Sequence, residues 1–190
     1  WGGAVEEPTA ARALWIDADN GTLVPLGGAD GAAQTLFGAG HYAGEADGLH
    51  RFIVLGGAEI GEGPSFLPSV NSPHGVLVKV NVAEETVTST DLDFTESHDQ
   101  LQRAGASLFE LSDGMFWLVG GYQAFGNSDG VVCGEVGPPC LPPKTLRFSL
   151  DASDKVEVLN DTLALPDEGD WQFGAFGSAA ILQSDGSWLV

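Results

Sequence analysis

The chain has 190 residues, enough for one large domain, and its 27 acidic and 7 basic residues give a formal net charge of −20 at pH 7. This charge excludes DNA, RNA and acidic lipid surfaces as partners, because like charges repel. No run of about 20 apolar residues is present, so membrane insertion is not expected, and the 27 glycines and 10 prolines favour a loop-rich all-β fold.

In chain order, the first predicted element is a strand, a turn and a second strand over residues 14–26. Asp17 begins the turn, where its side chain can accept a hydrogen bond from the backbone two residues on. The same phrase returns at residues 76–90 with Asn81 in the turn, and at residues 146–158 with Asp151 in the turn. We name its two strands c and d.

A second phrase alternates with the first and consists of a strand a, an Asp-Gly turn and a strongly apolar strand b. Its turns contain Asp47, Asp113 and Asp185, each followed by glycine, and Asp-Gly suits a two-residue hairpin because both positions tolerate positive φ. Strand b is predicted near residues 50–55, 115–119 and 187–190. Each copy ends at a Gly-Gly pair or at the chain end, and paired glycines permit a sharp chain reversal.

Four short strands per unit, repeated along a chain, predict the blades of a β-propeller. With a Gly-Gly pair after strand b and an Asp turn between c and d, the unit resembles the kelch repeat. The resemblance covers nearly the whole chain, in three blade periods at approximately 1–55, 56–119 and 120–190. The tryptophan usual in kelch strand d is missing, while the aromatic of strand b is retained as Phe52, Phe116 and Trp188.

The two chain ends have the sequence of one strand b cut in two. Residues 188–190 followed by residues 1–3 match the pattern of Phe52 to Gly57 position by position. We therefore expect a segment of a longer propeller, whose remaining blades, or a second copy of the chain, cover the open edges.

Cys133 and Cys140 lie in a polar, proline-rich segment that does not suit a strand. A disulfide between them would close a short loop and contribute about 2–3 kcal/mol. The alternative, a zinc pair, lacks four ligands at the usual spacing. We expect the disulfide, and with it an extracellular, cell-surface or periplasmic location.

Because strands alternate in direction within a blade, the b–c and d–a connections are expected on one face and the short turns on the other. The long connections are residues 58–75, 122–144, 27–37, 91–102 and 160–173. Function concentrates in loops carried by a rigid scaffold, so this face is the candidate binding surface. Its candidate residues are Glu59, Glu62, Phe66, His74, His98, Asp99, Tyr122, Phe125, Asp129 and Glu135.

Loop carboxylates can hold Ca²⁺, but solvated loop acids are the simpler interpretation, and no cofactor or metal is expected. His98 and Asp99 have the residue types for acid–base chemistry, yet no Ser or Cys nucleophile motif accompanies them, so no catalytic residue is assigned. His41 and His50 are expected to pack or to make a hydrogen bond. Strand aromatics such as Phe116 are expected to pack between blades.

These observations predict an interaction or structural module that binds a protein or a glycan through its loop face. Some kelch-type propellers are copper oxidases of alcohols or sugars, so the resemblance implies an alternative: part of a galactose-oxidase-like or other carbohydrate-active enzyme. Such a copper site needs Tyr, Cys and His together. The only tyrosines are Tyr42 and Tyr122, and the cysteines are expected to pair, so the catalytic residues would lie outside this chain.

Overall fold

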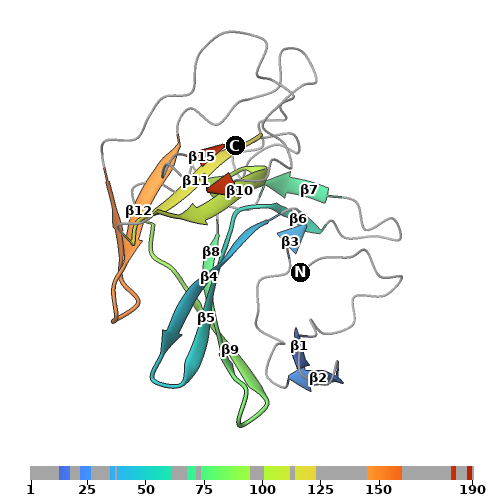
Figure 1. The fold of residues 1–190 in the computed structure, drawn as a ribbon. Coiled ribbons are helices and arrows are strands. Elements are labelled where there is room, and N and C mark those ends of the chain that lie inside the picture. The colour runs from blue at the N-terminus through green and yellow to red at the C-terminus, as the bar shows by residue number, and fades with distance from the viewer. Residues whose placement is uncertain are drawn as a thin grey trace, which may run out of the picture.

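The computed structural model describes residues 13–17, 22–26, 35–36, 38–60, 68–71, 74–94, 101–111, 114–122, 145–159, 181–182 and 188–189. The elements in these ranges are β-strands, and their pairings are antiparallel. The predicted all-β class is therefore confirmed. Two four-stranded sheets make up most of the described chain (Figure 1).

The first four-stranded sheet has the order β4-β5-β8-β9, which corresponds to the predicted strands a, b, c and d. At the β4–β5 turn, Asp47 and Gly48 have φ values of 52° and 75°, as a two-residue hairpin of this kind requires. The strand predicted at 50–55 is confirmed as β5. The strands are β4 (Ala39–Ala46), β5 (Leu49–Leu55), β8 (Gly75–Asn81) and β9 (Thr86–Asp91).

The second four-stranded sheet repeats this topology with the order β10-β11-β12-β13. Its strands again correspond to a, b, c and d, and the strand predicted near 115–119 is confirmed as β11. Figure 1 shows this sheet in yellow and orange beside the first in blue and green. The strands are β10 (Ala104–Glu110), β11 (Phe116–Tyr122), β12 (Leu146–Leu150) and β13 (Val156–Val158).

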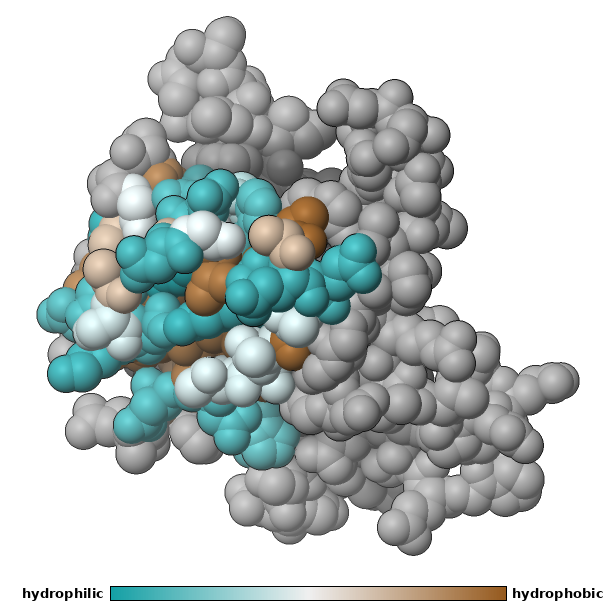
Figure 2. Space-filling view, turned by 90° about the horizontal axis from the view of Figure 1, so that it is seen from below, coloured by the Kyte–Doolittle hydropathy of each residue, from teal (hydrophilic) through white to brown (hydrophobic). Residues whose placement is uncertain are grey.

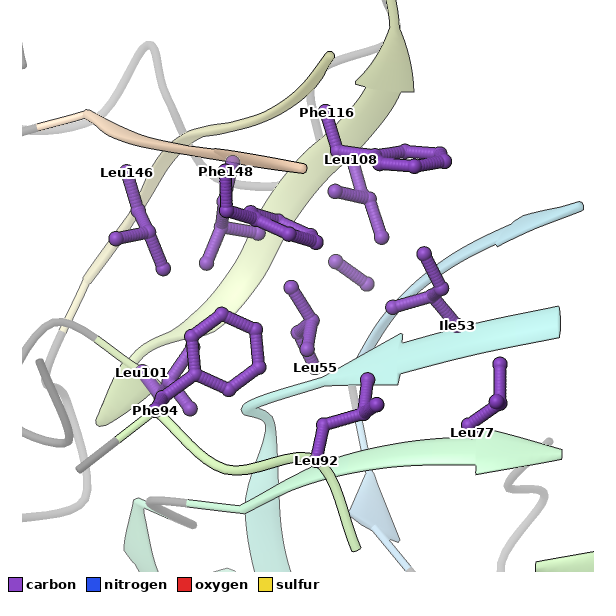
Figure 3. Close-up of a cluster of buried hydrophobic side chains, with 12 residues drawn as sticks. Ile53, Leu55, Leu77, Leu92, Phe94, Leu101, Leu108, Phe116, Leu146 and Phe148 are labelled. Carbon is purple, nitrogen blue, oxygen red and sulfur yellow. The ribbon is translucent and has the colours of Figure 1, made fainter. Parts of the chain in front are cut away.

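The main core lies between the two sheets. Alternate residues of each strand face it, because successive side chains of a strand point to opposite faces. Phe148 stacks on Phe116 with ring centroids 5.4 Å apart, and Phe94 meets Phe148 edge-on at 5.1 Å. In Figure 3, Phe148 and Leu146 of the second sheet face Leu55 and Leu77 of the first. The expected packing of strand aromatics is thus confirmed for Phe116 and Phe148.

The first sheet is also buried on its other face. A second cluster there contains five valines with exposed fractions of 2–7%, so the middle of this face is buried too, while Tyr42 at its β4 edge is 45% exposed. Burial on both faces explains the unbroken apolar runs at residues 52–55 of β5 and 76–78 of β8. The middle of the first sheet is therefore covered on both sides. The five residues are Val54, Val76, Val78, Val80 and Val87.

The glycine pairs after strands β5 and within β11 are required by the backbone. Gly56 and Gly57 have φ values of 60° and 94°, and Gly120 and Gly121 have 69° and 74°. A Cβ atom on Gly56 would lie 2.5 Å from the carbonyl oxygen of Leu101, a distance that side chains do not reach. The predicted chain reversal is not seen at the second pair, because β11 continues through it to Tyr122; the glycines instead allow a close approach of a neighbouring backbone.

Three smaller sheets complete the described strands. The predicted strands of residues 14–26 form a β1–β2 hairpin, and the strand predicted near 187–190 is β15, paired with β14. The third sheet, β3-β6-β7, corrects the prediction that residues 27–37 and 58–75 are loops. The strands are β1 (Ala13–Asp17), β2 (Thr22–Leu26), β14 (Ile181–Leu182), β15 (Trp188–Leu189), β3 (Thr35–Leu36), β6 (Ala58–Ile60) and β7 (Pro68–Asn71).

Candidate binding face at the loop end

The b–c and d–a connections of the first sheet meet at one end of it. The amide of Gly56 donates to the carbonyl of His74 at 2.9 Å, and the amide of Leu92 donates to the carbonyl of Gly75 at 2.8 Å. These bonds join the end of β5, the start of β8 and the end of β9. The predicted placement of both connections on one face is thus confirmed for this sheet. We call it the loop end, and the opposite end, with residues 47–48 and 82–85, the turn end.

Arg103 ties the two sheets together at the loop end. Its side chain is 1% exposed, and its Nη1 donates to the carbonyl of Gly120 at 3.2 Å. Its own carbonyl accepts from the amide of Gly57 at 2.7 Å. A buried guanidinium is costly unless hydrogen bonds compensate its desolvation, so Arg103 fixes both glycine pairs in place. Sequence reasoning missed this role, although Arg103 is one of only seven basic residues and directly precedes strand a.

The structure places three of the ten predicted binding residues at the loop end. Glu59 lies in β6, directly after the first glycine pair, and Tyr122 is the last residue of β11, directly after the second. His74 is exposed and precedes β8. The other predicted residues, and the cysteines of the expected disulfide, lie outside the described part of the chain: Glu62, Phe66, His98, Asp99, Phe125, Asp129, Glu135, Cys133 and Cys140.

The turn predicted around Asp151 is present between β12 and β13, and the aspartate side chain closes it. Oδ1 of Asp151 accepts hydrogen bonds from the amides of Ser153 at 2.7 Å and Lys155 at 2.9 Å. The hydrogen bond from the Lys155 backbone, followed by that from the Ser153 side chain, lowers the pKa of Asp151 below its ordinary value. Asn81 closes the corresponding turn of the first sheet, with Oδ1 accepting from the amide of Glu84 at 3.1 Å.

An ion cluster joins the same turn to the first sheet. Asp154, in the β12–β13 turn, places Oδ1 3.0 Å from Nη2 of Arg51 and also pairs with Lys79. Arg51 and Lys79 are directly opposite each other on β5 and β8. Sequence reasoning did not find this cluster, because Arg51 and Asp154 are brought together only when the two sheets stack.

The two histidines of β4 and β5 have the packing and hydrogen bonds expected of them. The ring of His41 meets Phe116 edge-on at 5.7 Å. Nδ1 of His50 lies 3.0 Å from the hydroxyl of Tyr42. Among the described residues, no group of three His, Cys, Asp or Glu side chains is close enough to hold a metal ion, so no Ca²⁺ or copper ligands are assigned there. Those residues also contain no helix long and apolar enough to cross a membrane.

Comparison with known proteins is informative at the level of structure and not of sequence. No protein-family model and no curated protein sequence matches the chain. Among solved structures, the chain is similar to a fungal alcohol oxidase of the AA5 family in complex with copper, with a TM-score of 0.53 and 15% sequence identity. The match covers 88% of this chain and 28% of the oxidase, so this chain spans under a third of its length. At this identity the similarity shows the fold alone.

Proposed function

We propose that this chain is a kelch-like segment of a β-propeller, about three blades long, that serves as an interaction or structural module. The observation that carries the proposal is the pair of four-stranded sheets, which have one topology and stack through a shared core. The first sheet has a buried apolar cluster on each face, which supports a blade with a neighbour on either side. The structural similarity to part of a longer chain, a fungal alcohol oxidase, supports the same interpretation.

The proposed partner is a protein or a glycan bound at the loop end. Main-chain hydrogen bonds to Gly56, Gly57 and Leu92 make this end rigid, while the connections leaving it differ in length and carry aromatic and acidic residues. Rigid scaffolds with variable connections are where binding residues concentrate. We assign the anchoring role to Phe66, Tyr122 and Phe125, because aromatic side chains supply most hot spots.

The proposed location is extracellular, cell-surface or periplasmic, and it depends on the Cys133–Cys140 disulfide. Mass spectrometry of a non-reduced digest tests it directly: the two peptides are expected to remain linked and to separate on reduction. Two free thiols in protein isolated from its native source would contradict both the disulfide and the location.

The binding proposal is tested with a glycan array, followed by titration calorimetry on the best ligand. Substitution of Phe66, Tyr122 or Phe125 by Ala is expected to weaken binding by about 1–2 kcal/mol each. Tyr42→Ala, at a distance from the loop end, is the matched control and is expected to leave the affinity unchanged. If none of the three loop-end substitutions changes the affinity for the glycan, the loop end is not its binding site.

A second candidate function is favoured by the structural comparison alone. One similar solved structure is an alcohol oxidase in complex with copper, so this chain could form part of a propeller oxidase of alcohols or carbohydrates. The described residues do not supply a set of metal ligands, so the catalytic residues are proposed to lie outside them. Peroxide release from primary alcohols by the copper-treated protein tests this candidate. Peroxide release by a protein that consists of residues 1–190 alone would show that catalytic residues lie within these residues.

A further inference from the structure

We propose that the first sheet carries a second binding surface, centred on Tyr42 and next to the turn end, that takes arginine- or lysine-rich segments of a partner protein. The surface consists of Tyr42, Glu45, His50 and Phe52, and we call it the Tyr42 surface. It shares no residue with the loop-end site, so either proposal can fail without the other.

The geometry of the Tyr42 surface is that of a fixed aromatic anchor. Tyr42 is 45% exposed, more than any other large hydrophobic side chain in the described residues. Its ring lies 5.2 Å from that of Phe52, and its hydroxyl is hydrogen-bonded to Nδ1 of His50. A ring held from both sides loses little conformational entropy on binding. Anchors of this kind are typical of binding hot spots.

The backbone is also irregular at this position. β4 is the edge strand of the sheet, and its register with β5 shifts between Tyr42 and Glu45. Bulges of this kind on edge strands commonly redirect side chains at functional positions. After the shift Glu45 pairs with His50, while Tyr42 pairs with Phe52, so the four side chains lie on one face. Glu45 is thus on the same face as the exposed ring, paired with His50.

The charge distribution identifies the partner as cationic. Four of the five basic side chains in the described residues are buried or half-buried, and three of these are held by the contacts above. The exposed charges are left almost entirely acidic; seen from below, hydrophilic side chains cover most of the described surface (Figure 2). With a net charge of −20, a second copy of the chain or a nucleic acid is repelled. The described acidic exposed residues are Glu45, Asp47, Glu84, Glu85, Asp91, Asp93, Glu110, Asp151 and Glu157.

A guanidinium or ammonium group can use both features of the surface. It is attracted to the face of an aromatic ring, and at exposed sites this attraction changes affinity by about two- to fivefold. The carboxylate of Glu45 adds an electrostatic attraction that an uncharged ligand does not receive. The ring provides specificity, which the general acidic charge alone does not.

The test uses two fluorescein-labelled peptides, hepta-arginine and its uncharged counterpart hepta-citrulline, in fluorescence anisotropy at 0.15 M NaCl. The intact protein is expected to bind hepta-arginine and to bind hepta-citrulline much more weakly. Tyr42→Leu, which keeps an apolar side chain but removes the ring, is expected to weaken hepta-arginine binding about two- to fivefold. Tyr42→Phe, which keeps the ring, is expected to retain the affinity.

Two controls separate this surface from its alternatives. Tyr122→Ala changes the loop end only and is expected to leave hepta-arginine binding unaltered. Equal affinity of the intact protein and Tyr42→Leu would show general electrostatic attraction and overturn the proposal. Equal affinity for the two peptides would also overturn the proposal. The same holds if Tyr122→Ala weakens hepta-arginine binding and Tyr42→Leu does not. Circular dichroism of each variant verifies that the fold is unchanged.

Discussion

At the scale of single residues, the Asp151 turn shows how one carboxylate organises a connection. Its Oδ1 accepts from two backbone amides and from the hydroxyl of Ser153 at 2.8 Å. These hydrogen bonds favour the charged carboxylate and lower its pKa. A group whose pKa is lowered by folding stabilises the protein above its unfolded pKa, and this stabilisation is lost as the pH falls through the folded pKa.

We therefore expect Asp151→Asn to reduce stability at pH 7 and to have less effect in acid. Asparagine keeps an oxygen acceptor for the turn but carries no charge, so it isolates the ionised carboxylate. Urea unfolding of both proteins should give a stability difference that is constant at neutral pH and shrinks below the ordinary aspartate pKa of about 4. Asp151→Ala removes the acceptor as well and should remain destabilised at every pH. If the stability difference between the unmodified protein and Asp151→Asn does not change with pH, the ionised carboxylate of Asp151 is not what stabilises the turn.

At the scale of elements, the sheets are joined by contacts that differ in kind along the strands. The middle is apolar, with Phe116 and Phe148 stacked. At the loop end the amide of Gly57 donates to the carbonyl of Arg103. At the other end Asp154, in the β12–β13 turn, makes an ion pair with Arg51 of the first sheet. Arg51 and Lys79 are opposite each other, an arrangement of like charges that is destabilising by itself. Asp154 offsets this repulsion and fixes the stacking of one sheet on the other.

We expect Asp154→Asn to destabilise the protein by roughly 1–3 kcal/mol, less than the loss of a fully buried ion pair, because the cluster is partly exposed. Chemical denaturation measures this loss. Adding Lys79→Gln to Asp154→Asn should recover part of it, because the repulsion between Arg51 and Lys79 is then removed. Glu157→Gln, which neutralises an exposed carboxylate on the neighbouring strand, is the matched control. A cost for Asp154→Asn no larger than that control would show that the cluster is not a joint between the sheets.

The same elements show which parts of the structure could be predicted from the sequence. Local signals are sufficient for β5 and β11, because each is an apolar run beside a glycine pair, which follows β5 and lies within β11. β6 and β7 are not predictable in this way, since their segment contains Gly and Pro and its pairing depends on Thr35 of β3. The Asp154 cluster and the buried Arg103 depend on how two sheets stack. For the binding site, the structure describes three of the ten predicted residues, and the site itself stays a prediction.

At the scale of the whole molecule, charge is the property that affects every part. A net charge of −20 on 190 residues favours expansion of the chain by self-repulsion. The basic residues that could relieve this repulsion at the surface are largely occupied in holding the two sheets: Arg51, Lys79 and Arg103. These basic side chains therefore make contacts inside the fold. The negative surface charge is screened mainly by ions of the solvent.

We accordingly expect stability to rise with salt at neutral pH. Raising NaCl from about 0.05 M to 1 M shortens the Debye length to about 3 Å and screens repulsion between exposed carboxylates, while partly buried pairs such as Asp154 with Arg51 are screened less. A gain of about 1 kcal/mol would raise the Tm of a domain of this size by about 2–4 °C. Thermal unfolding at pH 7.5 and again at pH 4.5 distinguishes this cause from a general salt effect. Near the sequence pI of 4.1 the net charge is small, so the increase should vanish or reverse there; an equal increase at both pH values would mean that charge repulsion is not what salt relieves.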